Sequence, residues 1–301
     1  MTAHRSGVLI RQILNRFKSS VKYFRRAPSG REIGRPVGAT LGTNDRLGRR
    51  RATMEASTAA NHSPIVASPR STDGTAVVAI WNDIRPEARA DFYEWHNREH
   101  MPERIGIPGF RRGRRFIAVD AQPEFFTLYD TDGPHVLSGA DYLQRLNNPT
   151  PWTRRAITAF VNTSRSLCNV VFSIGTGEGG LMLTVRYEVV EGGDSAMTDA
   201  LTKRILPALI TRPGLVRVRL CAADQRASSI QTAEKKNLEQ ARVPGWIILV
   251  EGAAEAATLR SACDELLSAD VLALAGAAAP VERGLYQLQY ARFSDGERAA
   301  Y

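Results

Sequence analysis

The chain has 301 residues, of which 43% are hydrophobic and 24% are charged, and its formal net charge is +9. This length suits two ordinary domains or one large one. No apolar run approaches the roughly 18 residues that cross a bilayer as a helix, which excludes an integral membrane protein of that kind. Residues 1–53 contain 13 of the 40 basic residues and only two of the 31 acidic ones, so 27 basic and 29 acidic residues remain. Because the positive charge lies in this leader, it does not indicate a nucleic-acid partner.

The leader, residues 1–73, is predicted to be largely unstructured, since it is rich in Gly, Ser, Thr and Pro after Gly30. Its first thirty residues contain no acid and carry apolar residues at helical spacing. A mitochondrial presequence has this pattern, and so does a helix that binds a membrane surface. The other interpretation is a dispensable upstream extension, with Met54 as the start of the protein proper.

The three cysteines form no Cys-x-x-Cys pair and lie in apolar stretches, as expected for packing residues in a reducing compartment. We therefore expect a cytoplasmic protein, or a mitochondrial one if the source is eukaryotic and the leader is a presequence.

The first half of the body, residues 74–176, has its apolar runs and turn residues in β-α-β-β-α-β order. The expected elements are a strand at 76–81, a helix that ends at Pro102, strands at 110–119 and 124–130, a helix at 136–146, a short helix from Trp152 and a strand at 167–174. This order is typical of a ferredoxin-like unit, in which two helices cover one face of a four-stranded antiparallel sheet.

The second half, residues 180–295, repeats this plan after a glycine-rich turn at 175–180. The expected elements are a strand at 181–190, a helix at 195–210, a strand at 215–221, a polar insertion at 222–242, a strand at 246–251, a helix at 255–268 and a strand at 284–293. The turn superficially suggests a phosphate-binding loop, but it lacks the Lys-Ser/Thr ending, so we interpret it as an interdomain connection.

Three turn residues recur at one offset, which indicates an internal repeat. Pro102, Pro108 and Gly109 are each followed 105 residues later by the same residue type. The predicted fold class is therefore α+β, with two tandem ferredoxin-like units that close their sheets into a barrel of the dimeric α/β type.

The same offset shows where the two halves differ. His96 and His100 are four residues apart on the first helix, whereas the second half has Leu201 and Ile205 there. Histidine accepts and donates protons near neutral pH, so a pair of imidazoles at an apolar pocket suits acid/base chemistry on a small molecule. The structural alternative is that one or both histidines only cap the helix end.

Residues 96–100 also spell H-x-x-E-H, the helix motif of one class of zinc proteases. Arg98 and Arg104 place positive charge beside such a metal, and Pro102 is expected to end the helix. No acidic third ligand is identified, although Glu178 lies at a conceivable distance along the chain. We therefore expect no metal site here and keep a zinc protease as a minor alternative.

Residues 95–104 (WHNREHMPER) and 107–110 (IPGF) resemble the His-Met-Pro and Pro-Gly segments of EthD-like proteins in the dimeric α/β-barrel superfamily. The resemblance covers about residues 76–175 in detail. It implies a ferredoxin-like barrel, formed in relatives by two chains, and it assigns the family's histidine to His100. Relatives include polyketide cyclases, muconolactone isomerases, cofactor-free monooxygenases and haem-binding proteins, so the fold does not fix one activity.

Further candidates to line the pocket lie in three places. Trp152 is expected to stack on an aromatic ligand, while Arg104, Arg154 or Arg155 holds a carboxylate or enolate. The alternative is a helix start in which Thr150 or Asn148 caps the helix, Trp152 fills the core and the arginines are solvated. Trp81 and Asn82, at the end of the first strand, are the remaining candidates, and the alternative for them is that Trp81 packs in the core and Asn82 is a turn residue.

Four arginines lie close together in residues 111–115. Because side chains alternate across a strand, some of them are expected to point toward the interior or a partner sheet, where they would attract an anionic substrate. A solvated strand edge is the alternative.

These residues predict an enzyme that transfers protons without a cofactor: an isomerase, cyclase or lyase acting on an aromatic, enolic or lactone compound. His100 is the expected acid/base, His96 a second base or orienting group, and an arginine the oxyanion stabiliser. The partner is expected to be a small hydrophobic or aromatic molecule, and self-association stays open. A non-catalytic binding or interaction module is the main alternative, and haem ligation by a histidine is a minor one.

Overall fold

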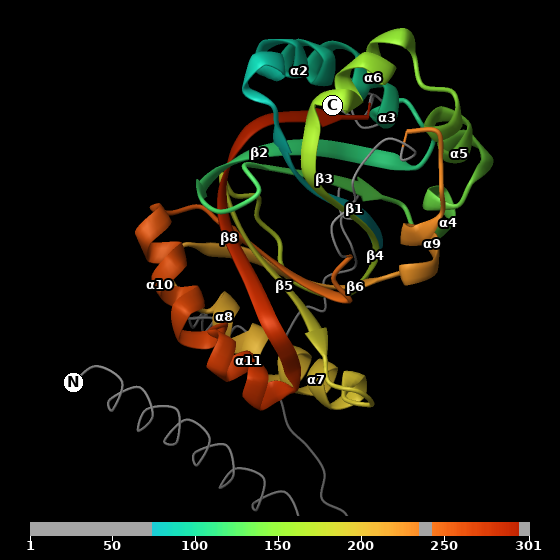
Figure 1. Ribbon diagram of the computed structural model, residues 1–301. Coiled ribbons are helices and arrows are strands. Elements are labelled where there is room, and N and C mark those ends of the chain that lie inside the picture. The colour runs from blue at the N-terminus through green and yellow to red at the C-terminus, as the bar shows by residue number, and fades with distance from the viewer. Residues whose placement is uncertain (1–73, 235–242, 295–301) are drawn as a thin grey trace, which may run out of the picture. The chain divides into compact units, whose positions relative to one another are not determined.

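Eight antiparallel strands form a closed barrel in the computed structural model, which describes residues 74–234 and 243–294 (Figure 1). The predictions for the leader, including those at Met54, lie outside these residues. The strands are β1 (Ala76–Ile84), β2 (Phe110–Asp120), β3 (Phe125–Thr131), β4 (Phe160–Gly175), β5 (Leu181–Val189), β6 (Leu215–Ala223), β7 (Trp246–Gly252) and β8 (Ala277–Phe293). Their order around the barrel is β1-β3-β2-β8-β5-β7-β6-β4.

Two long strands join the first half to the second. Strand β4 pairs with β1 along most of its length and with β6 through residues 168–175, and β8 pairs with both β5 and β2. Both strands begin seven residues before their predicted starts, at Phe160 and Ala277. The early part of β4 was missed because its residues 162–166 are polar, although Ser164 and Ser166 are buried.

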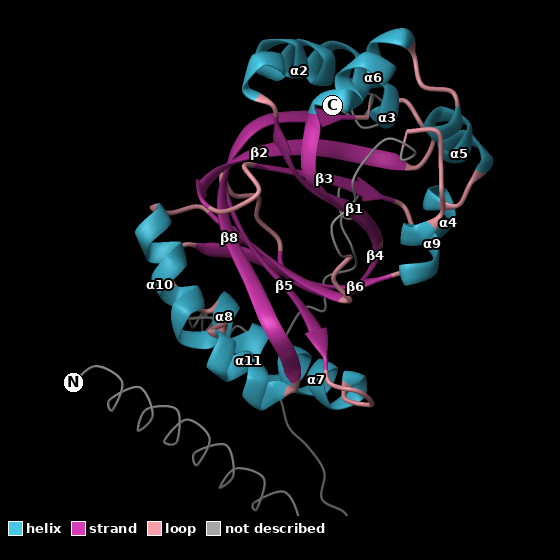
Figure 2. Ribbon diagram, viewed as in Figure 1, coloured by secondary structure: helices cyan, strands magenta, loops and turns pink. Residues whose placement is uncertain are grey.

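The helices lie outside the barrel in two groups, one beside β1–β4 and one beside β5–β8 (Figure 2). The first half has α2 (Arg89–Trp95), the π-helical turn η2 (His96–His100), α3 (Met101–Ile105), α4 (Pro134–Leu137), α5 (Ala140–Asn147) and α6 (Pro151–Ala156). The second half has α7 (Asp194–Ala200), the π-helical turn η4 (Leu201–Ile205), α8 (Leu206–Ile210), α9 (Gln225–Ser229), α10 (Ala256–Leu266) and α11 (Ala269–Ala275). Within the described ranges, none of these helices has the length and apolar character needed to cross a bilayer.

Pro102 does not end its helix, so that prediction is wrong. The chain continues as α3 to Ile105, because the wider π turn moves the hydrogen bond of the Met101 N–H to the carbonyl of His96, five residues earlier. Pro102 then occupies the first turn of α3, where its missing N–H costs little. The second half has its π turn 105 residues later, again just before a proline, Pro207.

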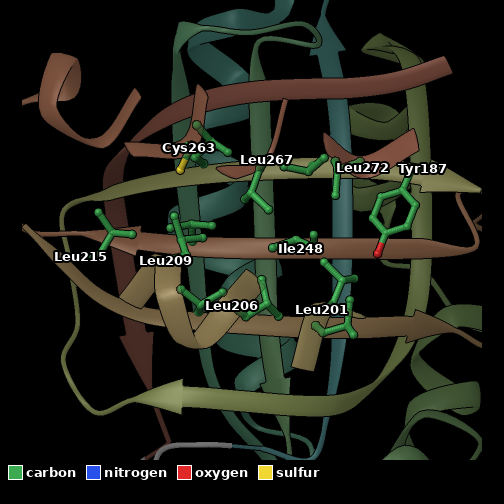
Figure 3. Packing of buried hydrophobic residues seen from close by; sticks show 14 of the residues in the cluster. Tyr187, Leu201, Leu206, Leu209, Leu215, Ile248, Cys263, Leu267 and Leu272 are labelled. Atoms are coloured by element: carbon green, nitrogen blue, oxygen red, sulfur yellow. The ribbon is translucent and has the colours of Figure 1, made fainter. Parts of the chain in front are cut away.

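The strands separate a barrel lumen from two outer layers, each lying between the sheet and its helices. Trp81, Phe126 and Met182 belong to the cluster of buried residues in the lumen, with Cys168 and Cys221. The outer layer of the second half is an apolar core, formed mostly by aliphatic side chains (Figure 3). All three cysteines are buried and free, in agreement with a packing role.

The arginines at residues 111–115 separate onto different faces of β2. Arg112 and Arg114 are buried in ion pairs with Asp130 of the neighbouring strand, and Arg114 also reaches Glu251 of β7. Arg115 points the other way, toward the helices, and contacts His96. The alternative of a solvated strand edge is wrong, because β2 pairs with β3 on one side and β8 on the other.

Candidate functional site

The outer layer of the first half has polar side chains at positions where that of the second half has aliphatic ones and one tyrosine. Strand register shows which residues of the two halves correspond. Arg115 pairs with Thr127 in the first half, and Leu220 pairs with Ile248 in the same way in the second. The polar residues of the first half and their counterparts are His96 and Leu201, His100 and Ile205, Arg104 and Leu209, Arg115 and Leu220, Thr127 and Ile248, and Asn82 and Tyr187. Figure 3 shows Leu201, Leu209, Ile248 and Tyr187 packed together. The fold thus closes this layer with apolar side chains in one half, so the polar ones in the other half indicate a site.

His96 is held in one neutral tautomer. Its ring is 4% exposed, and its Nδ1 lies 3.1 Å from Nη1 of Arg115. Because a guanidinium only donates hydrogen bonds, Nδ1 accepts and the imidazole proton resides on Nε2. Burial lowers the pKa of His96 well below its ordinary value, and the positive charges of Arg115 and Arg104 lower it further.

His100 lies against the rings of Trp95 and His96. Its ring lies 4.3 Å from the ring of Trp95 and 5.6 Å from that of His96, between centroids. Its Nδ1 is buried and has no hydrogen-bond partner among the described residues. Burial, Arg104 and His96 lower the pKa of His100 well below its ordinary value, so the ring is neutral at neutral pH.

Arg104 is buried beside both histidines and is neutralised by two carboxylates. It bonds Glu103 at 3.0 Å and also pairs with Glu234, which precedes the undescribed part of the predicted insertion. The backbone N–H of Glu234 donates to the carbonyl of Leu146, so the connection between β6 and β7 covers the first half at this point. The carboxylates outweigh the effect of burial and raise the pKa of Arg104 above its ordinary value. Its guanidinium therefore keeps its proton.

Glu99, the acid of the H-x-x-E-H motif, holds the start of α6 against the histidine-bearing helix. Its Oε1 accepts hydrogen bonds from the hydroxyls of Thr150 at 2.5 Å and Thr153 at 3.0 Å. Thr153 in turn accepts from Nε1 of Trp95 at 3.1 Å. Glu99 is thus occupied by structural contacts, and these contacts fix the Trp95 ring that lies against His100.

The structure does not bring Trp152, Arg154 and Arg155 together with the histidines. Trp152 donates to Asp91, Arg154 donates to the carbonyl of Pro149, and Arg155 is 65% exposed. Among the described residues, no hydrogen bond, ion pair or ring contact joins these three to His96 or His100. The alternative interpretation fits this segment, since Thr150 caps α6 by accepting from the N–H of Thr153 at 3.0 Å.

Trp81 and Asn82 point to opposite sides of the sheet, as neighbours on a strand do. Trp81 lies in the lumen, where its ring stacks on Phe126 at 4.8 Å. Asn82 pairs with Phe125, which packs with the helices, so Asn82 shares the layer of the histidines. Of these two candidates, only Asn82 therefore lies in the same layer as the histidines.

Two buried hydroxyls of this layer were missed in the sequence. Tyr129 of β3 and Thr163 of β4 are 2% and 3% exposed, and their hydroxyl oxygens have no partner among the described residues. Burial raises the pKa of Tyr129, so its phenol stays protonated. With His100 Nδ1 they are polar groups that a bound ligand or water would satisfy.

The two acidic residues considered for the zinc alternative are engaged by other side chains. Across residues 74–234 and 243–294, no three His, Cys, Asp or Glu side chains gather in a metal-binding arrangement. Glu178, the conceivable third ligand, forms an ion pair with Arg112 instead. Glu99 is bound to two threonines, as described above.

Comparison with known proteins supports the fold. No protein-family model matches the chain, and no curated protein matches its sequence. Among solved structures it is similar to an anthrone oxidase-like protein, with 12% identity, 73% of this chain and 93% of the other covered, and a TM-score of 0.52. A candidate monooxygenase from Fusobacterium nucleatum matches with 10% identity, 73% and 95% covered, and a TM-score of 0.48. These identities show the fold alone: the chain has the ferredoxin-like α/β-barrel fold that the anthrone oxidase-like protein also has.

Proposed function

We propose that the outer layer of the first half binds a small aromatic or enolic molecule and catalyses proton transfer on it without a cofactor. The observation that carries this proposal is His100, a neutral imidazole with an unpartnered Nδ1, in a layer that the second half fills with aliphatic side chains. A polar atom without a partner is costly in a packed core, so such atoms are typical of sites that meet a ligand.

In the proposed reaction His100 is the base. The C–H bond next to a carbonyl, or the O–H of an enol, breaks; the proton goes to Nδ1 of His100 and the electron pair becomes an enolate. Return of the proton to another atom completes an isomerisation, and attack by the enolate begins a cyclisation. His96 orients the ligand through its Nε2–H, and the positive charges of Arg104 and Arg115 stabilise the enolate.

The name of the similar anthrone oxidase-like protein favours the aromatic, enolisable class of substrate. Anthrone is a neutral aromatic ketone whose methylene protons are acidic, because their loss gives an aromatic enolate. We also propose that the chain is an EthD-like protein, because residues 95–104 and 107–110 resemble the His-Met-Pro and Pro-Gly segments of that family.

We further propose that residues 74–176 and 180–295 are two ferredoxin-like units of one chain. Three features support this: the strand orders β4-β1-β3-β2 and β8-β5-β7-β6, the π turns 105 residues apart, and the register shifts between Phe110 and Arg112 and between Leu215 and Arg217.

Deuterium exchange into the methylene of anthrone, followed by NMR in heavy water, tests the reaction directly. We expect the protein to accelerate exchange over buffer and His100→Gln to reduce the acceleration by about 100-fold, the contribution of a positioned base. His135→Gln is the matched control, because His135 is exposed on α4. Acceleration that survives in His100→Gln would contradict the proposal.

The second candidate function is a binding module with no chemistry. It rests on the same unpartnered polar atoms of His100, Tyr129 and Thr163, which a bound ligand would satisfy without any reaction. Anthrone binding measured by calorimetry, without accelerated exchange in the wild-type protein, would support this function and exclude the first.

A further inference from the structure

Two guanidinium groups are buried beside the histidines, and they differ in what neutralises them. Arg104 has the carboxylates of Glu103 and Glu234. Arg115 is 3% exposed and bonds only uncharged groups: Nδ1 of His96 at 3.1 Å, Oδ1 of Asn97 at 2.8 Å and Oε1 of Gln289 at 3.2 Å. Within the part of the chain that the structure describes, no carboxylate forms an ion pair with it.

The other arginines of the 111–115 cluster are all neutralised. Arg111 pairs with Asp132, Arg112 with Asp130 and Arg114 with Glu251. Among the described residues, Arg115 is thus the member of the cluster with a buried positive charge and no negative partner.

Aromatic rings partly stabilise the positive charge of Arg115 in place of a carboxylate. The guanidinium carbon of Arg115 lies 4.8 Å from the ring centre of Tyr93, 5.6 Å from that of Phe92 and 5.7 Å from that of Tyr290. Burial still lowers the pKa of Arg115, which is the direction expected of a cation that its surroundings do not fully neutralise. The group nevertheless remains protonated at neutral pH, because its ordinary pKa is far above 7.

The fold does not need this charge. The matching residue of the second half is Leu220, which is buried in the aliphatic core under η4. A buried cation is costly without an anion beside it, so its presence in only one half calls for a negative partner from outside the described residues.

We propose that the first-half site takes an aromatic anion and that Arg115 is its charge partner. The inference rests on the proposed function and names the substrate class of the same site. Among the described residues the hydrogen bonds of Arg115 engage Nε and Nη1, so Nη2 is the nitrogen left to donate to a carboxylate or a phenolate.

The test compares two probes of equal shape that differ in charge, 2-naphthoate and 2-naphthamide, by calorimetric titration of the full chain. We expect the wild-type protein to bind 2-naphthoate at least 10-fold more tightly than the amide. Arg115→Leu, which carries the residue of the second half, is expected to lose that preference, and Arg115→Lys to keep part of it. Arg98→Leu is the control, since Arg98 lies on η2 with the two histidines but its side chain is 73% exposed and pairs with Glu94.

Equal affinity of the wild-type protein for the two probes overturns the inference, as does binding of neither. A preference that persists in Arg115→Leu also overturns it. If Arg115→Leu does not fold, Arg115→Lys is compared instead, and a preference as large as that of the wild-type protein overturns the inference. The anthrone exchange experiment fails or succeeds separately, because anthrone is neutral. Accelerated exchange without a preference for 2-naphthoate contradicts this inference and leaves the proposed function standing. A preference for 2-naphthoate without accelerated exchange contradicts catalysis and supports an anion-binding module.

Discussion

Arg114 of β2 and Glu251 of β7 form an ion pair across the barrel lumen, with Nη1 2.9 Å from Oε2 and both side chains at most 2% exposed. The reciprocal pair joins Arg219 of β6 to Asp130 of β3. Each half thus supplies a guanidinium to the carboxylate of the other, as two copies do in an interface with two-fold symmetry. These pairs connect the halves inside the barrel, in addition to the strand hydrogen bonds.

Breaking one lumen pair should be far more costly than breaking a surface pair. We expect Arg114→Met to lower the free energy of unfolding by about 3 kcal/mol, because Glu251 loses a buried partner. Arg212→Met should cost less than about 1 kcal/mol, since its pair with Glu265 is more than a third exposed. Urea unfolding of both variants measures the difference, and equal losses would contradict the assignment of the lumen pairs as structural.

Stability should fall in mild acid because of the two histidines. Their pKa values in the fold are lowered, so below about pH 6.5 the unfolded chain binds protons that the folded chain does not. The free energy of unfolding is therefore expected to drop as the pH falls from 7 to 5, by up to about 1.4 kcal/mol per pH unit for each histidine. In the variant His96→Leu/His100→Ile, which carries the residues of the second half, urea unfolding at the two pH values should give a smaller difference. An unchanged pH dependence would show that the histidines are not buried in their neutral form.

Glu234→Gln should lower the pKa of His100 further. The substitution removes one of the two carboxylates that balance Arg104, whose charge already lowers the pKa of this imidazole. NMR titration of the imidazole carbon proton measures the shift. The double variant Glu234→Gln/Arg104→Met should titrate like Arg104→Met alone, because the carboxylate acts through the guanidinium. Glu265→Gln is the matched control at a surface arginine pair.

Gly113→Ala should disturb the helix that carries the histidines. A Cβ atom at this position would lie 2.2 Å from the sulfur of Met101 and 2.9 Å from Cδ1 of Tyr129. We expect a loss of about 1–3 kcal/mol in the free energy of unfolding from overpacking, and weaker ligand binding. Gly180→Ala is the control, since a Cβ there has nothing within 4 Å. Thermal unfolding of the two variants checks the contrast, and equal melting temperatures would refute it.

The fold could be predicted where one strand carries its own apolar run, as in β1 or β6. The early part of β4 was missed because Ser164 and Ser166 face a lumen that contains charged groups. No local sequence pattern indicates that the lumen of a barrel contains polar residues. The two histidines were found by comparing the halves. Glu234 was not found, since a residue in a polar insertion resembles a surface loop until the chain places it on Arg104, 130 positions away.

For Arg115 and Tyr129 the strand alternation predicts a face of the sheet but not what lies over that face, and Thr163 lies in the part of β4 that was missed. Their roles depend on the helix that packs above them, which is set by tertiary structure. The continuation of the helix through Pro102 was missed for a different reason, because a π turn leaves no sign in residue type alone.

Strand β8 has a consequence for the synthesis of the protein on the ribosome. It is the last strand of the barrel, and it supplies Gln289 to Arg115 while pairing with β2 along residues 285–293. Until these residues have emerged, β2 keeps an open edge that is prone to pair with other chains. A product released early would therefore have an incomplete anion site and a tendency to aggregate, so that competence to bind ligand is restricted to chains translated through the final strand.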